Sequence, residues 1–132
     1  MQHVALLSND IFETLAVMQS ATAWGGYEFM PGQAHDYYER VKVKLGPDAP
    51  FTEEQYATAE KMGILIDKDD QGILLQIFTK PIGDRPTIFF EIIQRVGCLN
   101  DVTKIQKPGC GGFGKVNIVL LLLMYISCHS WV

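Results

Sequence analysis

The chain has 132 residues, with 11 basic and 15 acidic side chains and a formal charge of -4 at neutral pH. This length suits one domain with a hydrophobic core of its own. An acidic chain without a basic stripe cannot follow a phosphate backbone, so we expect no nucleic-acid partner.

The cysteines and the N-terminal residues point to a compartment. Cys98, Cys110 and Cys128 match neither a disulfide framework nor a zinc knuckle in number or spacing, which favours a reduced, intracellular protein. The N-terminal residues lack the charged region of a secretion signal. We therefore expect a cytoplasmic location. A plastid location is the alternative if a transit peptide precedes Met1.

The first half of the chain predicts a strand followed by three helices. Residues 3–7 form a short apolar strand. Asp10 and Glu13 have the spacing of a capping box and open the first helix. A second helix is predicted over residues 36–45, and Thr52 caps a third.

Three further strands are predicted over residues 64–67, 73–79 and 87–96, because apolar runs there are separated by turn residues. The element order is then strand, helix, helical insert and three strands. This order predicts an α+β fold of the βαβββ type, with a curved mixed sheet and helices on one face.

Glu91 is a carboxylate inside the most hydrophobic of these strands. Aromatic and β-branched residues crowd both faces of the run, so a charge there needs a cation, a hydrogen-bond network or a metal. Alternation places Phe89, Glu91 and Ile93 on one face. An ion pair with Arg85 or Arg95, or an exposed edge position, explains Glu91 equally well.

Gln76 is a second polar residue among apolar ones, since it shares a strand face with Leu74 and Phe78. Buried amides need partners. If the two long strands pair, Gln76 and Glu91 point into one pocket that has Phe78 and Phe89 as aromatic walls. A glutamine on an exposed edge strand is an equally good interpretation.

The chain has three histidines, His3, His35 and His129. Non-haem Fe(II) sites commonly use two histidines and one carboxylate on one face of the metal. Only His3 lies on a predicted strand, whereas His35 begins a predicted helix, where a side chain is more often solvated. A single strand histidine is usually a core residue, so His3 and Glu91 alone do not establish a metal site.

Two features of the C-terminal residues bear on nucleotide binding and on membrane insertion, and neither supports that function. Residues 109–115 fit G-x-x-x-x-G-K, but Val116 stands where the phosphate-binding loop needs Ser or Thr, which favours a connector. Residues 118–126 form an apolar run of nine, well short of the roughly twenty that cross a bilayer. We therefore expect no membrane span.

Several segments taken together resemble the 4-hydroxyphenylpyruvate dioxygenases, most of all those of plants. The resemblance covers about residues 2–115, and its segments are residues 2–6, 25–31, 67–81, 83–87, 90–95 and 109–115. It implies the vicinal-oxygen-chelate fold, built from βαβββ modules. Residues 1–115 would be the last module of the catalytic C-terminal domain.

The resemblance also implies a reaction. The family enzymes use Fe(II), one ion per subunit, to convert 4-hydroxyphenylpyruvate and O2 into homogentisate and CO2. This step belongs to tyrosine catabolism and supplies the precursor of tocopherol and plastoquinone. The expected small-molecule partners of the chain are therefore 4-hydroxyphenylpyruvate and O2.

Site residues follow from the resemblance position by position. His3 and Glu91 match two of the three metal ligands of the family. The expected substrate-pocket residues are an amide and three aromatic rings: Gln76, Phe78, Phe89 and Phe113.

The sequence departs from the family in three respects. No residue matches the first histidine ligand, the preceding module and the N-terminal half have no counterpart, and the resemblance stops at Lys115. Residues 116–132 form an aberrant hydrophobic tail where the family has a closing helix. We expect a truncated dioxygenase that is inactive alone. The alternative is an incompetent splice or truncation product that acts through subunit interaction, as a homodimer or with full-length subunits.

Overall fold

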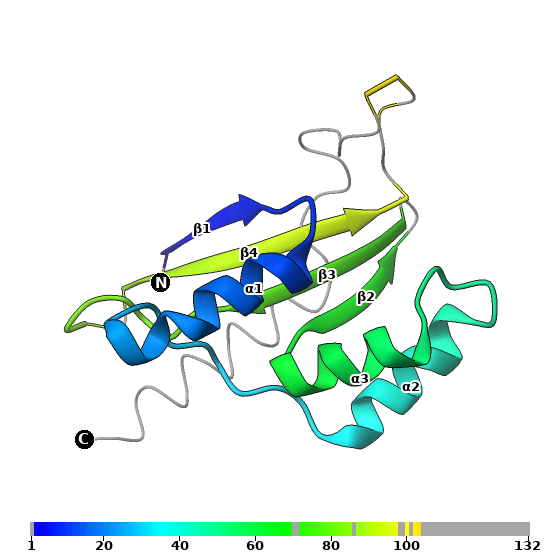
Figure 1. Cartoon of the computed structure of the whole chain (residues 1–132), viewed down its shortest axis with the longest axis horizontal. Helices are drawn as coiled ribbons and strands as arrows, with labels where there is room; N and C mark the ends of the chain where they lie inside the picture. The colour runs from blue at the N-terminus through cyan, green and yellow to red at the C-terminus, as the bar shows by residue number, and fades with distance from the viewer. Residues whose placement is uncertain (1, 70–71, 86, 98–99, 101, 104–132) are drawn as a thin grey trace.

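The computed structural model describes residues 2–69, 72–85, 87–97, 100 and 102–103. These residues form four strands and three α-helices, with one short 3-10 helix (Figure 1). In chain order the elements are β1 (Gln2–Leu7), α1 (Ile11–Ser20), η1 (Thr22–Trp24), α2 (His35–Leu45), α3 (Glu53–Met62), β2 (Leu65–Asp69), β3 (Gly72–Phe78) and β4 (Ile88–Val96). Each predicted strand and helix is present, with boundaries shifted by one or two residues.

Side chains at the helix ends explain where α1 and α3 begin and stop. The Asp10 carboxylate accepts a hydrogen bond from the Glu13 amide at 3.1 Å. Thr52 and Gln55 form a complete capping box, in which each side chain accepts from the other's backbone amide. Gly63 ends α3 in the left-handed conformation, with φ near 80°, that favours glycine.

The four strands form one mixed sheet in the order β1-β4-β3-β2. β1 runs parallel to β4, whereas β3 is antiparallel to both β4 and β2. The parallel pairing requires a long crossover between β1 and the later strands, and the three helices lie within it (Figure 1). The predicted α+β fold with a mixed sheet is therefore confirmed.

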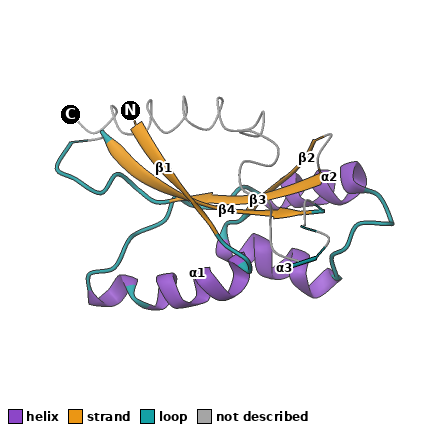
Figure 2. Ribbon diagram, turned by 90° about the horizontal axis from the view of Figure 1, so that it is seen from above, coloured by secondary structure: helices purple, strands orange, loops and turns teal. Residues whose placement is uncertain are grey.

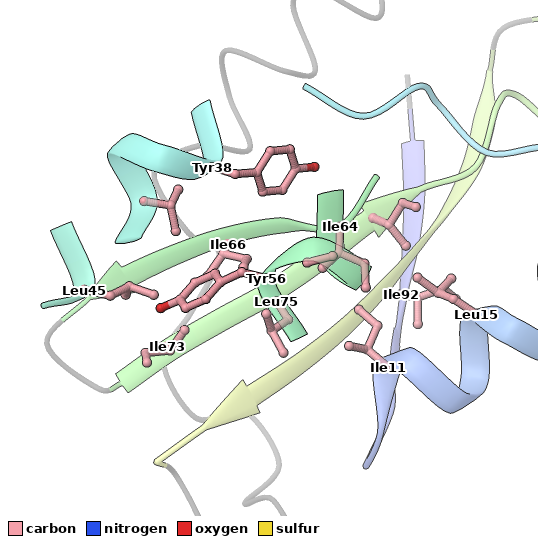
Figure 3. Packing of buried hydrophobic residues seen from close by; sticks show 13 residues of the cluster. Ile11, Leu15, Tyr38, Leu45, Tyr56, Ile64, Ile66, Ile73, Leu75 and Ile92 are labelled. Carbon is pink, nitrogen blue, oxygen red and sulfur yellow. The ribbon is translucent and has the colours of Figure 1, made fainter. Parts of the chain in front are cut away.

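One face of the sheet carries the main hydrophobic core. Ile11 and Leu15 of α1 point toward Ile92 of β4, while Tyr56 of α3 lies over Leu75 of β3 (Figure 3). Helices α1 and α3 cover this same face (Figure 2). The expectation of helices on one face is confirmed, and α2 adds Tyr38, Val41 and Leu45 to the same core.

The opposite face of the sheet carries a smaller cluster and most of the buried polar groups. Leu65, Phe78 and Phe89 pack together there, and Met30 and Tyr37 cover part of them. The buried polar side chains that alternation places on this face are Asp67, Gln76, Glu91 and Arg95. We call it the polar face.

The two edges of the sheet differ. At the β2 edge, the Tyr37 hydroxyl of α2 donates to the Ile66 carbonyl at 2.9 Å and accepts from the Ile66 amide at 3.0 Å. At the β1 edge, no strand of the described part of the chain pairs with the side that faces away from β4. Tyr37 therefore occupies backbone groups at one edge that a further strand would need.

Some expectations fall on residues that the structure does not describe. These are Phe113, His129, the segment 109–115 and the tail 116–132. Among the described residues, no helix has the length and hydrophobicity needed to cross a bilayer.

Candidate metal and substrate site

The strand register brings the sequence-predicted site residues to the polar face. Residues directly paired across neighbouring strands project to the same side. His3 pairs with Phe89, and Phe78 pairs with Glu91. Gln76 pairs with Ile93, two residues beyond Glu91, so the five predicted site residues that the structure describes all share this face. Both β3 and β4 are central strands, and the interpretation of Gln76 or Glu91 as an exposed edge residue is wrong.

His3 and Glu91 form the closest polar pair of the site. Their Nε2 and Oε2 atoms lie 3.6 Å apart, and the Glu91 side chain is fully buried while that of His3 is 25% exposed. Two donor atoms that bind one ion, each about 2.1 Å from it, lie roughly 3 to 4 Å apart. The pair is therefore spaced to share a cation, with one side open to solvent.

Aromatic rings flank this pair. The His3 imidazole stacks on Phe89, with ring centroids 5.4 Å apart and planes 15° apart. Phe89 in turn meets Phe78 edge to face, with centroids 5.9 Å apart. Phe78 and Phe89 are almost completely buried. The stack fixes the plane of the imidazole and places an apolar wall beside the Glu91 carboxylate.

Gln76 supplies the second polar function of this face. Its side chain is fully buried, and neither its amide nitrogen nor its amide oxygen has a hydrogen-bond partner in the described structure. A buried amide without partners is destabilising by about 1 to 3 kcal/mol. Such a group is available to donate to, and accept from, a bound ligand.

The ion-pair interpretation of Glu91 can be compared with the observed contacts. Arg95, one of the two candidate partners, donates to Asp69 at 2.8 Å, and Arg85 is exposed. Glu91 instead lies beside the His3 imidazole. An imidazole is both a weaker cation than a guanidinium and a better metal ligand.

His35 lies away from this site, as its predicted position implied. It is the first residue of α2, its side chain is 72% exposed, and its Nδ1 lies 2.9 Å from both Glu60 carboxylate oxygens. The hydrogen bond that His35 donates to Glu60, together with the negative charge of Glu60, raises the pKa of His35. His35 is an exposed ion-pair residue and does not join His3 and Glu91.

Sequence reasoning missed the partly buried Asp69–Arg95 pair on the polar face. Arg95 is 4% exposed. Alternation from Glu91 would have placed Arg95 on the same face, four residues along the strand. Asp69 required the β2–β3 register, which sets Asp69 beside Gly72.

His3 and Glu91 are of the ligand types that a ferrous site uses, but they are two where such a site commonly has three. One imidazole and one carboxylate belong to the two-histidine, one-carboxylate set typical of non-haem iron. Among the described residues, no three His, Cys, Asp or Glu side chains are grouped so that they could hold a metal. The polar face thus supplies two ligands.

Searches of known sequences find close relatives. The chain is 55% identical to 4-hydroxyphenylpyruvate dioxygenase of Plectranthus scutellarioides over 119 residues, or 88% of this chain and 27% of that protein. It is 52% identical to the Arabidopsis thaliana protein of that name over 89% of this chain and 26% of that protein. The Neurospora crassa protein is 44% identical over 71% of this chain and 22% of that protein. No family model matches.

Solved structures share the fold. A fusion protein of a xylose isomerase-like TIM barrel and 4-hydroxyphenylpyruvate dioxygenase matches 96% of this chain and 17% of its own, with a TM-score of 0.63 and 26% identity. A triple mutant of 4-hydroxymandelate synthase from Streptomyces coelicolor matches 89% of this chain and 27% of its own. Its TM-score is 0.60 at 29% identity.

The matches cover most of this chain and a small part of each relative. The chain spans about a quarter of the length of the plant relatives. Identity near 55% over 119 residues, joined to a vicinal-oxygen-chelate fold, leaves one interpretation of its ancestry. The chain belongs to the 4-hydroxyphenylpyruvate dioxygenase family.

Proposed function

We propose that the polar face binds Fe(II) and 4-hydroxyphenylpyruvate and takes part in their reaction with O2 to homogentisate and CO2. The observation that carries this proposal is the pairing of His3 with a fully buried Glu91 on the face that also holds Gln76. Relatives that bear the dioxygenase name support it.

His3 and Glu91 are the metal-holding residues in this proposal. Burial strongly disfavours an isolated carboxylate, so a divalent cation beside Glu91 stabilises the ionised form. Stacking on Phe89 limits rotation of the His3 ring, so Nε2 stays directed at Glu91. Bound Fe(II) would supply the coordination of the keto acid and the activation of O2.

The remaining residues bind the organic substrate. The Gln76 amide donates and accepts hydrogen bonds with the substrate's polar groups, which satisfies an amide that has no described partner. Phe78 and Phe89 pack against the substrate ring and exclude water from the metal. We assign Phe113 to the same aromatic wall on the resemblance alone.

A second candidate function is non-catalytic association with other dioxygenase subunits. The two-donor set on the described polar face favours it, because a facial iron triad needs a third protein ligand. In this case the chain acts through its sheet surface. Co-purification with a full-length relative supports this candidate, and the absence of any complex contradicts it.

Anaerobic titration of Fe(II) into the pure chain, followed by calorimetry, tests the metal proposal. We expect saturable binding that is lost in His3→Ala and Glu91→Gln and retained in His35→Ala. His35 is a matched control, since it is an exposed histidine outside the site. Binding that survives Glu91→Gln would overturn the assignment.

Turnover of 4-hydroxyphenylpyruvate tests whether the isolated chain is a competent enzyme. We expect the isolated chain to form little or no homogentisate above the Glu91→Gln background, because the described ligand set is incomplete. Turnover well above that background would show that the chain is a competent enzyme and would eliminate the non-catalytic candidate.

A further inference from the structure

Thr79 directly follows the last residue of β3 and is completely buried. Its amide donates to the Phe90 carbonyl of β4 at 2.8 Å, as in a regular antiparallel pair. The Phe90 amide, however, donates to the Thr79 hydroxyl at 2.9 Å, where a regular pair would use the Thr79 carbonyl. A side chain therefore completes the hydrogen-bonded pair at this end of β3.

The segment 28–30 holds Thr79 from the side opposite β4. Phe29 forms an antiparallel bridge with Thr79. The Met30 amide donates to the Phe78 carbonyl at 2.9 Å, one residue before Thr79. The backbone at Thr79 is thus anchored independently of β4. Its hydroxyl is therefore a fixed acceptor for the β4 amide that it binds.

The residues before and after Phe90 both belong to the candidate site. Phe89 stacks on the His3 imidazole, with ring centroids 5.4 Å apart. The Glu91 Oε2 atom lies 3.6 Å from His3 Nε2. Alternation along the strand sends the side chains on either side of Phe90 to the same face. A displacement of the Phe90 amide would therefore move the ring and the carboxylate together relative to His3.

We propose that Thr79 is a positioning residue, whose hydroxyl holds the Phe90 amide. It thereby fixes Phe89 and Glu91 relative to His3. The donor atoms of a functional site must be held within about 0.5 Å of their working positions. Hydrogen bonds behind the metal ligands commonly supply this precision. The part of the proposal that concerns Fe(II) rests on the proposed function, whereas the part that concerns the ring and the carboxylate does not.

Two substitutions separate the hydroxyl from the bulk of the side chain. Thr79→Val keeps the shape and removes the hydroxyl, whereas Thr79→Ser keeps the hydroxyl and removes one methyl group. Gln94→Leu is the matched control, because it also removes a β4-linked hydrogen bond between a side-chain acceptor and a backbone amide, that of Ile11. A merely structural role for Thr79 predicts that Thr79→Val and Gln94→Leu behave alike.

NMR of the metal-free full chain tests the positioning without iron. In the natural chain and in Thr79→Ser, we expect a protected Phe90 amide and a nuclear Overhauser effect between the His3 and Phe89 rings. In Thr79→Val the Phe90 amide should exchange roughly fivefold faster, as expected for one lost hydrogen bond. The Overhauser effect should disappear in Thr79→Val and persist in Gln94→Leu.

Three NMR results would overturn the proposal. The first is an unprotected Phe90 amide in the natural chain, a result that does not require Thr79→Val to fold. The second is a Thr79→Val chain that retains the contact between the His3 and Phe89 rings. The third is a Thr79→Ser chain that loses this contact although it keeps the hydroxyl.

Anaerobic titration of Fe(II) tests the consequence for the metal. Thr79→Val should raise the Kd for Fe(II) by about tenfold or more. Thr79→Ser and Gln94→Leu should bind Fe(II) as the natural chain does. An unchanged Kd in Thr79→Val, or an equal loss of affinity in Gln94→Leu, would overturn the metal part of the proposal. If the natural chain binds no Fe(II), the metal part fails together with the proposed function, and the NMR measurements decide the positioning by themselves.

Discussion

Gln76 and Gln94 lie on neighbouring strands in opposite hydrogen-bonding situations. Both amide atoms of Gln76 lack partners in the described structure. Gln94, by contrast, accepts from the Ile11 amide at 2.8 Å and donates to the Asn9 carbonyl at 3.0 Å, which ties the start of α1 to β4. The Gln76 amide therefore lowers the stability of the fold, whereas the Gln94 amide raises it.

Substitution by leucine should separate the two glutamines. We expect Gln76→Leu to leave the free energy of unfolding unchanged or raise it by up to about 1 kcal/mol, because it removes an unsatisfied buried amide. Gln94→Leu should lower it by about 1 to 2 kcal/mol, because the Ile11 amide loses its acceptor. Urea denaturation measures both. A large loss of stability in Gln76→Leu would mean that the amide has a structural partner in the folded chain.

The His35–Glu60 pair predicts a pH dependence. Its hydrogen bond and charge raise the pKa of His35 above the ordinary value of about 6.5. The pair therefore stabilises the fold fully at pH below the ordinary value, and this contribution disappears as the pH rises through the folded pKa. Histidine NMR titration should show a lower His35 pKa in Glu60→Gln. An unchanged pKa would mean that the pair is absent in solution.

At the scale of elements, Tyr37 links α2 to the edge of β2. We expect Tyr37→Phe to lower the free energy of unfolding by about 1 to 3 kcal/mol, because the Ile66 amide and carbonyl lose their shared partner. Hydrogen exchange should quicken more at the Ile66 amide than at β4 amides, because β4 amides feel only the loss of global stability. Unchanged exchange at Ile66 would contradict the assigned hydrogen bonds.

Local sequence determined most of the elements in advance. Asp10 and Thr52 mark helix starts through short-range chemistry, and the structure confirms both of them. Alternation also placed Gln76 and Glu91 on defined strand faces. Their proximity, however, depends on the β3–β4 register, which links residues far apart in the chain. The sequence pattern alone could not fix that register. It therefore predicted neither the Asp69–Arg95 pair nor the exposure of each sheet edge.

At the scale of the whole molecule, metal binding should couple to folding. An ion held by His3 and Glu91 binds only the folded chain, because these residues are 88 positions apart in sequence and meet through β1–β4 pairing. At a free Fe(II) concentration one hundred times Kd, the added stability is about 2.7 kcal/mol. Anaerobic thermal melts should therefore show a higher Tm with Fe(II). The His3→Ala variant should show no shift.

The Tyr37 contact with Ile66 has a further consequence for assembly. A sheet that can add strands at both edges polymerises without limit, as in amyloid. Here the Tyr37 hydroxyl occupies the amide and the carbonyl of Ile66, within the β2 edge. An incoming strand would have to displace that hydroxyl before it could pair with β2. Tyr37→Phe frees both groups, so we expect this variant to aggregate through β2 at lower concentrations than the natural sequence.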